Sequence, residues 1–376
     1  MNVTVGIGLL GCGTVGSEVA DRLEREREAI ERAAGVRYEL CGVAIRDAAK
    51  DRPDSLEQRL FTRDAVALVD DSRVDLVVEL IGGSTDAAGL VERALDRGRH
   101  VVTANKDVIG TQGPRLRALA ATRSVALRYD AAVAGAIPLL RTIGEALAGD
   151  EVQAVAGILN GTCGFILEAM ERGASFDEAL ACARDLGYAE ADASNDLEGT
   201  DAAHKLASIA QLAFGLAVIS PRIRRRGILG ISASDIETAA ANGMRLRLLA
   251  ATARTHNGIA AEVAVALVPR EHEFARAEGA ENVAHVVARD AGRLSLRGSG
   301  AGGRATASAV LGDVVAVLRE IGERRDFSAR QRFAALDPAL DVVPFFEGHR
   351  RLDALPEFPV WDDGAIAAAL RPEACA

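Results

Sequence analysis

Lysine is the scarcest basic residue in the sequence, so its three positions are the first candidates for proton chemistry. Of 44 basic residues, 41 are arginine and only Lys50, Lys106 and Lys205 are lysine. A lysine ammonium can lose a proton when burial lowers its pKa, whereas a guanidinium stays charged. Because arginine serves here as the ordinary surface cation, a retained lysine indicates a position that needs a transferable proton. Chance retention is the alternative at each position.

Lys205 follows an acidic segment whose spacing suggests a site. Five carboxylates fall within residues 190–201, and Asp201 and Lys205 are four residues apart. On a helix that begins at Gly199 or Thr200, those two side chains share one face. The segment fits a site that binds a substrate ammonium, or a site that holds a lysine by hydrogen bonds. A solvated loop that ends in a surface ion pair is the alternative.

The elements that must position these residues begin with a nucleotide-binding pattern. Residues 3–9 are apolar and predict a strand, residues 11–16 read GCGTVG, and a helix is predicted up to about residue 34. In a strand, G-x-G-x-x-G, helix unit, the first glycine permits a tight turn, the second lets a pyrophosphate approach the backbone, and the third allows close packing. The helix N-terminus attracts the phosphates. We therefore expect a dinucleotide-binding domain.

The predicted second strand, residues 37–45, is followed by cations. Folds that prefer NAD commonly place an acid at the end of this strand, where it binds the ribose 2′-hydroxyl. Arg46 and Lys50 instead favour a 2′-phosphate, so we expect NADP, while the neighbouring Asp47 leaves NAD possible. Two solvated surface cations are the alternative.

Strands and helices continue to alternate as far as about residue 131, which predicts a mainly parallel, doubly wound α/β sheet of the Rossmann type. Ligands of such sheets bind beyond the carboxyl ends of the strands. Lys106 is expected to close a strand at this edge, one residue after Asn105 and close to the nicotinamide. The predicted strands cover residues 74–80, 100–104 and 125–131, and the predicted helices cover residues 86–97 and 113–123.

From about residue 138 helices dominate, with strands between them, which predicts an α+β domain whose sheet is covered on one face. A second glycine cluster, residues 298–303, precedes a predicted helix at residues 306–321. Residues 326–376 show little periodicity and are expected to form a tail packed on the surface, of unknown role. The other predicted helices cover residues 138–148, 163–173, 175–186 and 200–214, and the predicted strands cover residues 152–159, 244–255 and 259–268.

Composition suggests a multi-domain cytoplasmic protein. The 376 residues suffice for two or three domains, with 49% apolar and 26% charged residues as in ordinary globular proteins. A net charge of −10 argues against nucleic acid or an anionic membrane as a partner. No apolar run reaches the ~18 residues of a membrane span, and no signal-peptide pattern precedes the first strand. The isolated cysteines and scattered histidines predict neither a disulfide framework nor a histidine metal site.

The chain resembles homoserine dehydrogenases in six segments that cover roughly residues 3–320 in the family's order. They read GLLGCGTVG, TANKDVIG, AAVAGAIPLLRTI, GILNGTCGFIL, GYAEADASNDLEGTDAAHKLA and GSGAGGRATASAVLGD. The resemblance implies an NAD(P)-dependent dehydrogenase that interconverts L-aspartate 4-semialdehyde and L-homoserine in threonine, methionine and isoleucine biosynthesis. It also implies a Rossmann domain over residues 1–135, completed by a returning helix at about 304–322, and a substrate-binding and dimerisation domain over residues 136–303.

The resemblance further implies the roles of individual residues. Lys205 would give a proton to the aldehyde oxygen in reduction and accept the hydroxyl proton in oxidation, with Lys106 sharing that work and Asp201 orienting Lys205. Hydride delivery to a carbonyl builds alkoxide charge, which a cation able to give a proton stabilises. The implied substrate-binding residues are Glu190, Asp196, Asp201, Thr162 and Tyr188. The implied cofactor-binding residues are Gly11, Gly13, Thr14, Val15, Gly16, Arg46, Lys50, Thr103, Asn105, Lys106, Gly187 and Gly302.

A cation loop, a dimer and the absence of a regulatory domain are also implied. The resemblance implies a structural sodium ion, held mainly by the backbone carbonyls of Asp130, Val133, Gly135 and Ile137. It implies a homodimer and, because only about 50 residues follow the last matching segment, no C-terminal regulatory ACT domain. Where the family often has Gly-Thr-Thr-Asn-Tyr, residues 161–165 read GTCGF. This departure leaves a dehydrogenase of a related amino aldehyde as an alternative, and a non-catalytic NADP-binding sensor as another.

Overall fold

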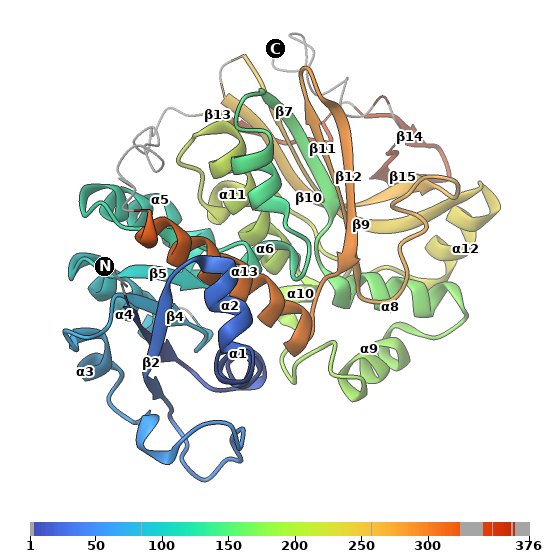
Figure 1. Ribbon diagram of the computed structural model, residues 1–376. Coiled ribbons are helices and arrows are strands. Elements are labelled where there is room, and N and C mark those ends of the chain that lie inside the picture. Colours follow the sequence, from blue (N-terminus) through green and yellow to red (C-terminus); the bar gives the residue numbers. More distant parts are fainter. Residues whose placement is uncertain are drawn as a thin grey trace. The chain divides into compact units, whose positions relative to one another are not determined.

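The chain forms two compact units, each with its own main β-sheet (Figure 1). The computed structural model describes residues 4–83, 85–256, 258–323, 341–347, 349–361 and 364. Unit 1 is Met1–Pro138 with Gly302–Ala334, and unit 2 is Leu139–Ala301 with Ala335–Ala376. In the described part of the chain, no helix combines the length and the apolar character needed to cross a bilayer.

The sheet of unit 1 is parallel throughout, which confirms the predicted doubly wound α/β fold. Its strands among the described residues are β1 (Thr4–Leu10), β2 (Arg37–Ala44), β3 (Phe61–Thr62), β4 (Leu76–Glu79), β5 (His100–Thr103) and β6 (Leu127–Arg128). Their order is β3-β2-β1-β4-β5-β6. The chain reverses its direction of winding between β1 and β4, the place at which such sheets bind ligands.

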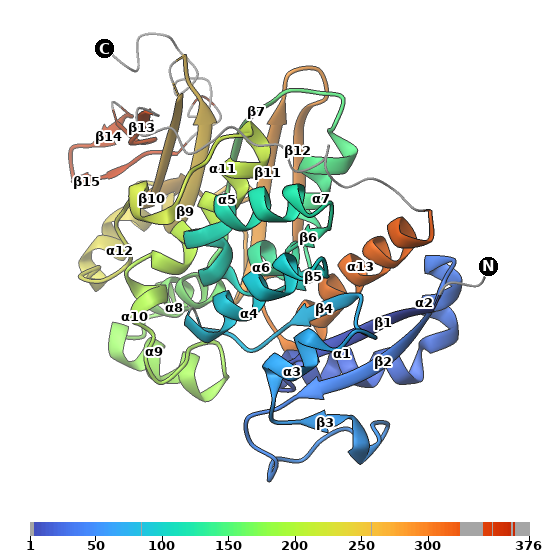
Figure 2. The ribbon, with the colours of Figure 1, turned by 90° about the vertical axis from the view of Figure 1, so that its left-hand side faces the viewer.

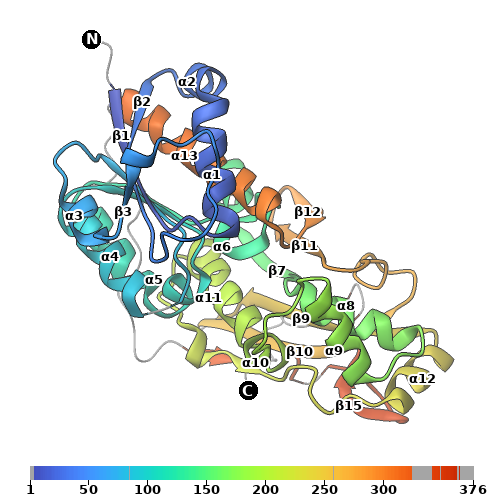
Figure 3. The same ribbon diagram turned by 90° about the horizontal axis from the view of Figure 1, so that it is seen from below.

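Helices cover both faces of this sheet, so its central strands are apolar and buried. The helices of unit 1 are α1 (Thr14–Arg25), α2 (Arg27–Ala34), α3 (Ala65–Asp70), α4 (Thr85–Asp96), α5 (Lys106–Thr122), α6 (Ala131–Ala134) and α13 (Gly303–Gly322). Figure 3 shows α1, α2 and α13 on one side of the sheet and α3, α4 and α5 on the other. α13 comes from far along the sequence, and its Val310, Val314 and Val317 join the core beneath α1.

Three boundaries in unit 1 differ from the predictions. α1 and α2 are separate helices where one was predicted, with Glu26 between them. The strand predicted over residues 125–131 contains only the short β6, because the chain turns into α6 at Ala131. Lys106 opens α5 instead of closing a strand, because the side chain of Asn105 caps that helix.

A mixed sheet with helices packed against it forms unit 2, as predicted for an α+β domain. Its described strands are β7 (Val152–Ile158), β8 (Arg224–Arg225), β9 (Met244–Arg254), β10 (Gly258–Pro269), β11 (Glu281–Ala288), β12 (Gly292–Ser299) and β13 (Asp341–Val343), with β14 (Arg351–Leu352) and β15 (Leu355–Pro359) in a separate hairpin. The order of the main sheet is β12-β11-β7-β9-β10-β13, with β8 beside β10. The long antiparallel neighbours β9 and β10 lie side by side (Figure 2).

The helices of unit 2 place the acidic segment next to this sheet. They are α7 (Leu139–Arg141), α8 (Gly161–Glu171), α9 (Phe176–Asp185), α10 (Ser194–Leu197), α11 (Thr200–Phe214) and α12 (Ala233–Ala241). α8, α11 and α12 pack against β9, and α11 also contacts β7. α11 begins at Thr200 after the left-handed Gly199, as predicted. β11, β12 and α12 were not predicted.

The C-terminal segment is not a surface tail, contrary to the prediction. Phe345, Phe346 and Trp361 are buried in a hydrophobic cluster with side chains of β7, β9, β10 and β11. The backbone N–H of Trp361 donates a hydrogen bond of 2.8 Å to the carbonyl of Leu267 in β10. Part of the segment therefore completes the core of unit 2. Residues 326–340 and 365–376 lie outside the described residues.

Candidate active site

The turn between β1 and α1 in unit 1 has the geometry of a phosphate-binding loop. Gly11 has a φ of +97°, and a Cβ there would lie 2.6 Å from the carbonyl oxygen of Leu80. A Cβ at Gly16 would lie 2.1 Å from the carbonyl oxygen of Gly11, so this position also requires glycine. A Cβ at Gly13 would have no neighbour within 4 Å. The first and third glycines are therefore needed for the fold, while the second leaves its side of the turn open for a ligand.

A second helix N-terminus lies beside this turn. Gly302 has a φ of +114° and precedes α13, whose first residue is Gly303. A Cβ at Gly303 would lie 2.9 Å from the Cγ2 atom of Thr14, the first residue of α1. Val15 follows Thr14 and is half-buried against the core of unit 1. The two predicted glycine clusters therefore bring the N-termini of α1 and α13 together, which concentrates backbone N–H donors for an anion.

The residues after β2 include one cation that the sequence analysis missed. The predicted residues Arg46 and Lys50 are exposed. Arg52 donates a hydrogen bond of 2.6 Å to the carbonyl oxygen of Asp47 and another to the carbonyl oxygen of Cys12, within the glycine turn. The segment after β2 is thus tied to the phosphate-binding turn. Three basic residues within seven positions were the signal that could have found Arg52.

A buried acid, Glu79, organises the carboxyl ends of β4 and β5. Its carboxylate accepts a hydrogen bond of 2.6 Å from the hydroxyl of Thr103 and one of 2.8 Å from the backbone N–H of Ile81. The Thr103 hydroxyl in turn accepts a hydrogen bond of 2.9 Å from the backbone N–H of Asn105. This chain of hydrogen bonds fixes the segment that leads to Lys106. Glu79 was missed, although an acid at the end of the buried segment VDLVVEL was a usable signal.

The segment predicted to hold a cation lies in unit 1 and is buried. Asp130, Val133, Gly135 and Ile137 are all buried, and Gly135 reverses the chain with a φ of +63°. The backbone N–H of Asp130 donates a hydrogen bond of 2.9 Å to a carboxylate oxygen of Asp313 in α13. The segment is therefore tied to the returning helix. Backbone carbonyls are hard oxygen donors, so the residues fit a hard cation such as sodium.

In unit 2, Lys205 and the buried Asp201 form an ion pair. The Nζ atom of Lys205 lies 2.9 Å from Oδ2 of Asp201, and the two side chains are 12% and 1% exposed. The same Nζ donates a hydrogen bond of 2.6 Å to the carbonyl oxygen of Leu159, which follows β7. The predicted sharing of one helix face is therefore confirmed, and the alternative of a solvated surface pair is wrong.

Asn160, which was not among the predicted residues, joins this ion pair to a second predicted acid. Its Nδ2 atom donates hydrogen bonds to Oδ1 of Asp196 at 2.7 Å and to Oδ2 of Asp201 at 2.8 Å. Its Oδ1 atom accepts a hydrogen bond of 2.8 Å from the backbone N–H of Cys163 and so caps α8. Asn160 lies in the segment GILNGTCGFIL. An asparagine between a strand and a helix was a signal for a cap, but not for the contacts with the acids.

The other predicted residues of unit 2 lie on two elements. The hydroxyl of Thr162, in α8, donates a hydrogen bond of 2.6 Å to the carbonyl oxygen of Tyr188, whose ring packs 5.2 Å from that of Phe165. Gly187 follows α9 with a φ of +74°. Glu190 is exposed on the following loop, and no contact of its side chain with Asp196, Asp201 or Lys205 occurs among the described residues. The structure thus joins Thr162 to Tyr188 but does not bring Glu190 to the lysine.

Cys163 and Gly164 are the residues that depart from the common family sequence, and Cys163 packs beside the acids. Cys163 is fully buried, and its Sγ atom lies 3.2 Å from the carbonyl oxygen of Asp196. Burial raises the pKa of the Cys163 thiol, and the carboxylates of Asp196 and Asp201 raise it further, so the group stays neutral. A Cβ at Gly164 would lie 3.2 Å from the carbonyl oxygen of Gly279. Position 164 therefore faces the loop before β11.

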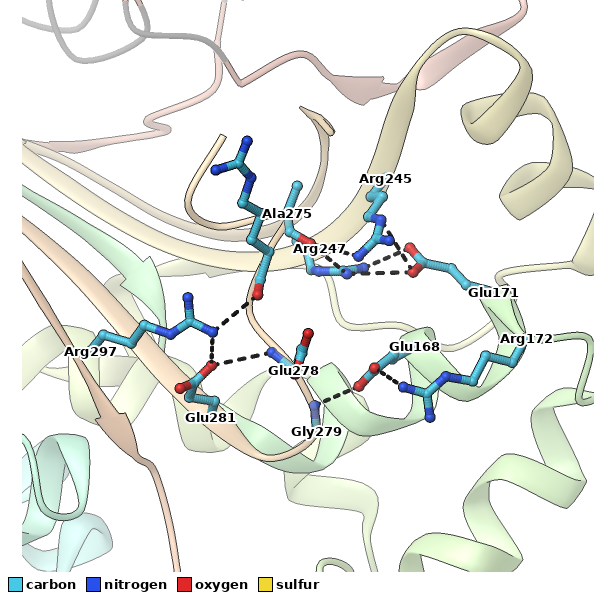
Figure 4. A network of polar contacts seen from close by, with 11 residues as sticks. Glu168, Glu171, Arg172, Arg245, Arg247, Ala275, Glu278, Gly279, Glu281 and Arg297 are labelled. Atoms are coloured by element: carbon cyan, nitrogen blue, oxygen red, sulfur yellow. Dashed lines mark hydrogen bonds and ion pairs between the residues drawn. The ribbon is translucent and has the colours of Figure 1, made fainter. Parts of the chain in front are cut away.

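An ion-pair network holds the far end of α8 (Figure 4). Glu171 pairs with the buried Arg247 at 2.7 Å and lies 3.6 Å from Arg245, both in β9. Glu168 pairs with Arg172 and accepts a hydrogen bond of 2.5 Å from the backbone N–H of Gly279. α8 is thus fixed to the sheet and to the loop before β11, so the end that carries Asn160 and Thr162 has rigid support.

A dinucleotide-binding turn in one unit and a lysine paired with a buried carboxylate in the other define a class of protein. They are the parts of an NAD(P)-dependent oxidoreductase that acts on a CH–OH group, because such an enzyme needs a nucleotide site and a residue that exchanges a proton with oxygen.

Comparison with known proteins identifies the family. The model of the homoserine dehydrogenase NAD-binding domain matches residues 11–130, and the homoserine dehydrogenase model matches residues 138–315. The homoserine dehydrogenase of Corynebacterium glutamicum is 43% identical over 321 residues, which cover 84% of this chain and 72% of that protein. The chain therefore belongs to the homoserine dehydrogenase family, as the six segments indicated. Members interconvert L-homoserine and L-aspartate 4-semialdehyde with NAD(P) in amino-acid biosynthesis.

Solved structures agree with this assignment. A homoserine dehydrogenase from Thiobacillus denitrificans is 36% identical with a TM-score of 0.85, and the match covers 92% of this chain and 80% of that one. A hyperthermophilic archaeal homoserine dehydrogenase in complex with NADPH is 25% identical with a TM-score of 0.69, and the match covers 84% of this chain and 98% of that one.

Proposed function

We propose that Lys205 is the proton donor and acceptor of the homoserine dehydrogenase reaction in this chain. The observation that carries the proposal is the position of its Nζ atom, 2.6 Å from the carbonyl of Leu159 and 2.9 Å from the carboxylate of Asp201. A bound nicotinamide supplies or removes the hydride. Lys205 as an ammonium gives a proton to the aldehyde oxygen in reduction, and as an amine it accepts the hydroxyl proton in oxidation.

Asp201 and Asp196 have different roles in this proposal. Asp201 orients Lys205, because its carboxylate touches the lysine and is buried. Asp196 is half-buried beside it and, with Glu190 on the exposed loop, binds the ammonium group of the substrate. Thr162 and Tyr188 are the other proposed contacts of the substrate. A substrate that carries both an ammonium and a reacting oxygen needs a carboxylate for one and a proton donor for the other, which these side chains supply.

Unit 1 is the proposed cofactor domain, with NADP preferred and NAD possible. Gly11, Gly13, Thr14, Val15, Gly16 and Gly302 would hold the pyrophosphate, as their turn and helix N-termini suggest. Arg46 and Lys50 would meet the 2′-phosphate, as exposed cations at the end of β2. Thr103, Asn105 and Lys106 would lie by the nicotinamide, and Lys106 would assist the proton transfer. Gly187 in unit 2 stays a predicted cofactor contact.

Residues 136–303, most of which belong to unit 2, are the proposed substrate-binding and dimerisation domain. We propose that the enzyme works as a homodimer in the cytoplasm. The family resemblance supports the dimer. The described cysteines Cys12, Cys41, Cys163 and Cys182 are all free thiols, which suits a reducing compartment.

The proposed sodium ion would have a structural role. It would be held by the backbone carbonyls of Asp130, Val133, Gly135 and Ile137, whose burial and chain reversal support this assignment. The hydrogen bond from Asp130 to Asp313 would then connect the ion to α13. The chemistry of the reaction does not require the ion in this proposal.

Product analysis tests the proposed function. Purified protein is incubated with L-homoserine and NADP⁺, reduction is followed by absorbance, and the aldehyde is trapped and identified by mass spectrometry. One aspartate semialdehyde for each NADPH is expected. Turnover only with an amino alcohol one carbon longer would favour the related-substrate alternative. Binding of NADPH without turnover would favour the sensor.

A further inference from the structure

We propose that Asn160 is a positioning residue that sets the carboxylate of Asp201 and, through it, the ammonium group of Lys205. The inference rests on the proposed function, because it concerns the geometry of the proposed proton donor. Asn160 is buried and follows β7 directly after Leu159, the residue whose carbonyl accepts a hydrogen bond from Lys205. Two successive residues therefore hold the lysine, one directly and one through Asp201.

The amide of Asn160 allows two carboxylates to lie close together. A side-chain amide has two N–H donors and one carbonyl acceptor. Asn160 donates to both Asp196 and Asp201, at 2.7 and 2.8 Å. The oxygen of Asp201 that accepts from Asn160 is also the one that faces the Nζ atom of Lys205. The shared donor thus fixes the carboxylate of Asp201 relative to both Asp196 and Lys205.

Hydrogen bonds and close backbone packing fix the position of the Asn160 side chain. Its Oδ1 atom caps α8 through the backbone N–H of Cys163 at 2.8 Å. A Cβ on the next residue, Gly161, would lie 2.7 Å from the carbonyl oxygen of Ala280, so the backbone here packs closely. The other end of α8 is fixed by the network of Figure 4. Asn160 is therefore held in place independently of the acids it contacts.

Asn160→Ser separates the capping role from the positioning role. Serine is a good N-cap, so α8 keeps its cap, but the short hydroxyl cannot reach both carboxylates. The turnover number for homoserine oxidation should fall about 100-fold, because a misplacement of ~1 Å costs about that much in rate. The Michaelis constant for homoserine should rise by a much smaller factor, because Asn160 also holds Asp196. The deuterium isotope effect with homoserine labelled at the carbinol carbon should rise, because the chemical step becomes slower.

Gln211→Leu is the matched control. Gln211 is also a buried amide in unit 2, on α11, and its Nε2 atom donates a hydrogen bond to the carbonyl of Val218. Its loss removes a buried hydrogen bond without touching either acid, so turnover and isotope effect should stay as in the unmodified protein. If Asn160→Ser matches Gln211→Leu in both readouts, Asn160 only caps α8 and the positioning role is wrong.

A spectroscopic readout separates this inference from the proposed function. With only three lysines, protein labelled with ¹³C at the lysine Cε atoms gives three signals, which Lys205→Arg assigns. The Lys205 signal should shift in Asn160→Ser but not in Gln211→Leu, while the Lys50 and Lys106 signals stay in place. An unchanged Lys205 signal would overturn the positioning role. Failure of the unmodified protein to oxidise homoserine would instead overturn the proposed function, and the lysine signals would still decide the role of Asn160.

Discussion

The ammonium group of Lys205 has three hydrogens, and two of them point to protein acceptors. One is donated to the carbonyl of Leu159 and another lies against the carboxylate of Asp201. In the proposed mechanism, the third hydrogen is the one that meets the substrate oxygen. An arginine at this position would keep the positive charge, but its guanidinium has a different shape and does not give up a proton, so it cannot act as donor and acceptor.

Arg46 is the residue on which the NADP preference can be tested. Arg46→Ala should weaken NADPH binding about 10- to 100-fold, because a hydrogen bond to a charged group contributes about 1.5–3 kcal/mol. NADH binding should change less than about twofold, since NADH lacks the 2′-phosphate. Fluorescence titration measures both affinities. Arg37→Ala, at the exposed start of the same strand, is the control. An equal loss for both nucleotides would remove Arg46 from the 2′-phosphate site.

At the scale of elements, the turn between β1 and α1 was predictable because its requirements are local. Gly11 has a positive φ, and a Cβ at Gly16 would meet the carbonyl oxygen of Gly11 in the same turn. The same holds for α11, whose start at Gly199 and ion pair at four-residue spacing follow from helix geometry.

Substitution by alanine should have different effects at Gly11 and at Gly13. Gly11→Ala places a Cβ 2.6 Å from a backbone carbonyl in a left-handed conformation, so the protein should lose about 2 kcal/mol or more of unfolding free energy. Gly13→Ala meets no neighbour within 4 Å and should fold normally, yet bind NADPH more weakly. Denaturation and nucleotide titration separate the two effects. Normal NADPH binding by Gly13→Ala would argue against a pyrophosphate at this turn.

His100, at the start of β5, should make stability depend on pH. Burial lowers its pKa to about 4, against a smaller opposing effect of Asp75, and its Nδ1 atom accepts a hydrogen bond from the Ala126 N–H. Between about pH 6.5 and 4 the unfolded chain binds a proton that the folded chain does not, so stability falls as the pH falls.

This effect should amount to about 2 kcal/mol between pH 7 and pH 5. Denaturation of the unmodified protein and of His100→Gln at both pH values measures it, and the variant should lose this part of the pH dependence. His256→Gln, at an exposed histidine, is the control and should keep it. The same pH dependence in all three proteins would mean that His100 is not buried in its neutral form.

Other elements could not be predicted because their reasons lie far away in the sequence. β12 alternates exposed and half-buried residues, so its segment GRLSLRGS lacks the apolar pattern of a buried strand. Asn160 contacts acids 36 and 41 residues further along the chain. Glu79 acquires its partner Thr103 only when β4 and β5 pair. Local patterns indicated the caps and turns, but not these tertiary contacts.

At the scale of the whole molecule, the C-terminal segment contributes side chains to the hydrophobic core of unit 2. The sequence suggested a surface tail, because the segment has little periodicity. Its aromatic residues nevertheless pack into the core of unit 2, where the rings of Phe345 and Trp361 stack with their centroids 6.0 Å apart. Short strands and isolated aromatic residues carry no periodic signal, so only the packing of the complete chain reveals their place.

Phe358 tests this view of the core. Its side chain is buried in β15, with the guanidinium of Arg226 5.3 Å from the ring centre. Phe358→Ala should lower the unfolding free energy of unit 2 by about 3–5 kcal/mol. Trp361 is the only tryptophan in the chain, so its fluorescence reports on this unit. Leu229→Ala, at an exposed leucine of unit 2, should change little. If Phe358→Ala and Leu229→Ala had similar unfolding free energies, the segment would not belong to the core.

The most direct test of the central claim compares homoserine oxidation by the unmodified protein and by Lys205→Arg, at matched occupancy by NADP⁺. Loss of a positioned proton acceptor typically costs 10²–10⁴-fold in rate, so the turnover number of Lys205→Arg should fall by about that factor. NADPH binding, measured by fluorescence titration, should remain unchanged because Lys205 is not among the proposed nucleotide contacts. Near-normal turnover by Lys205→Arg would contradict the assignment of Lys205 as proton donor and acceptor.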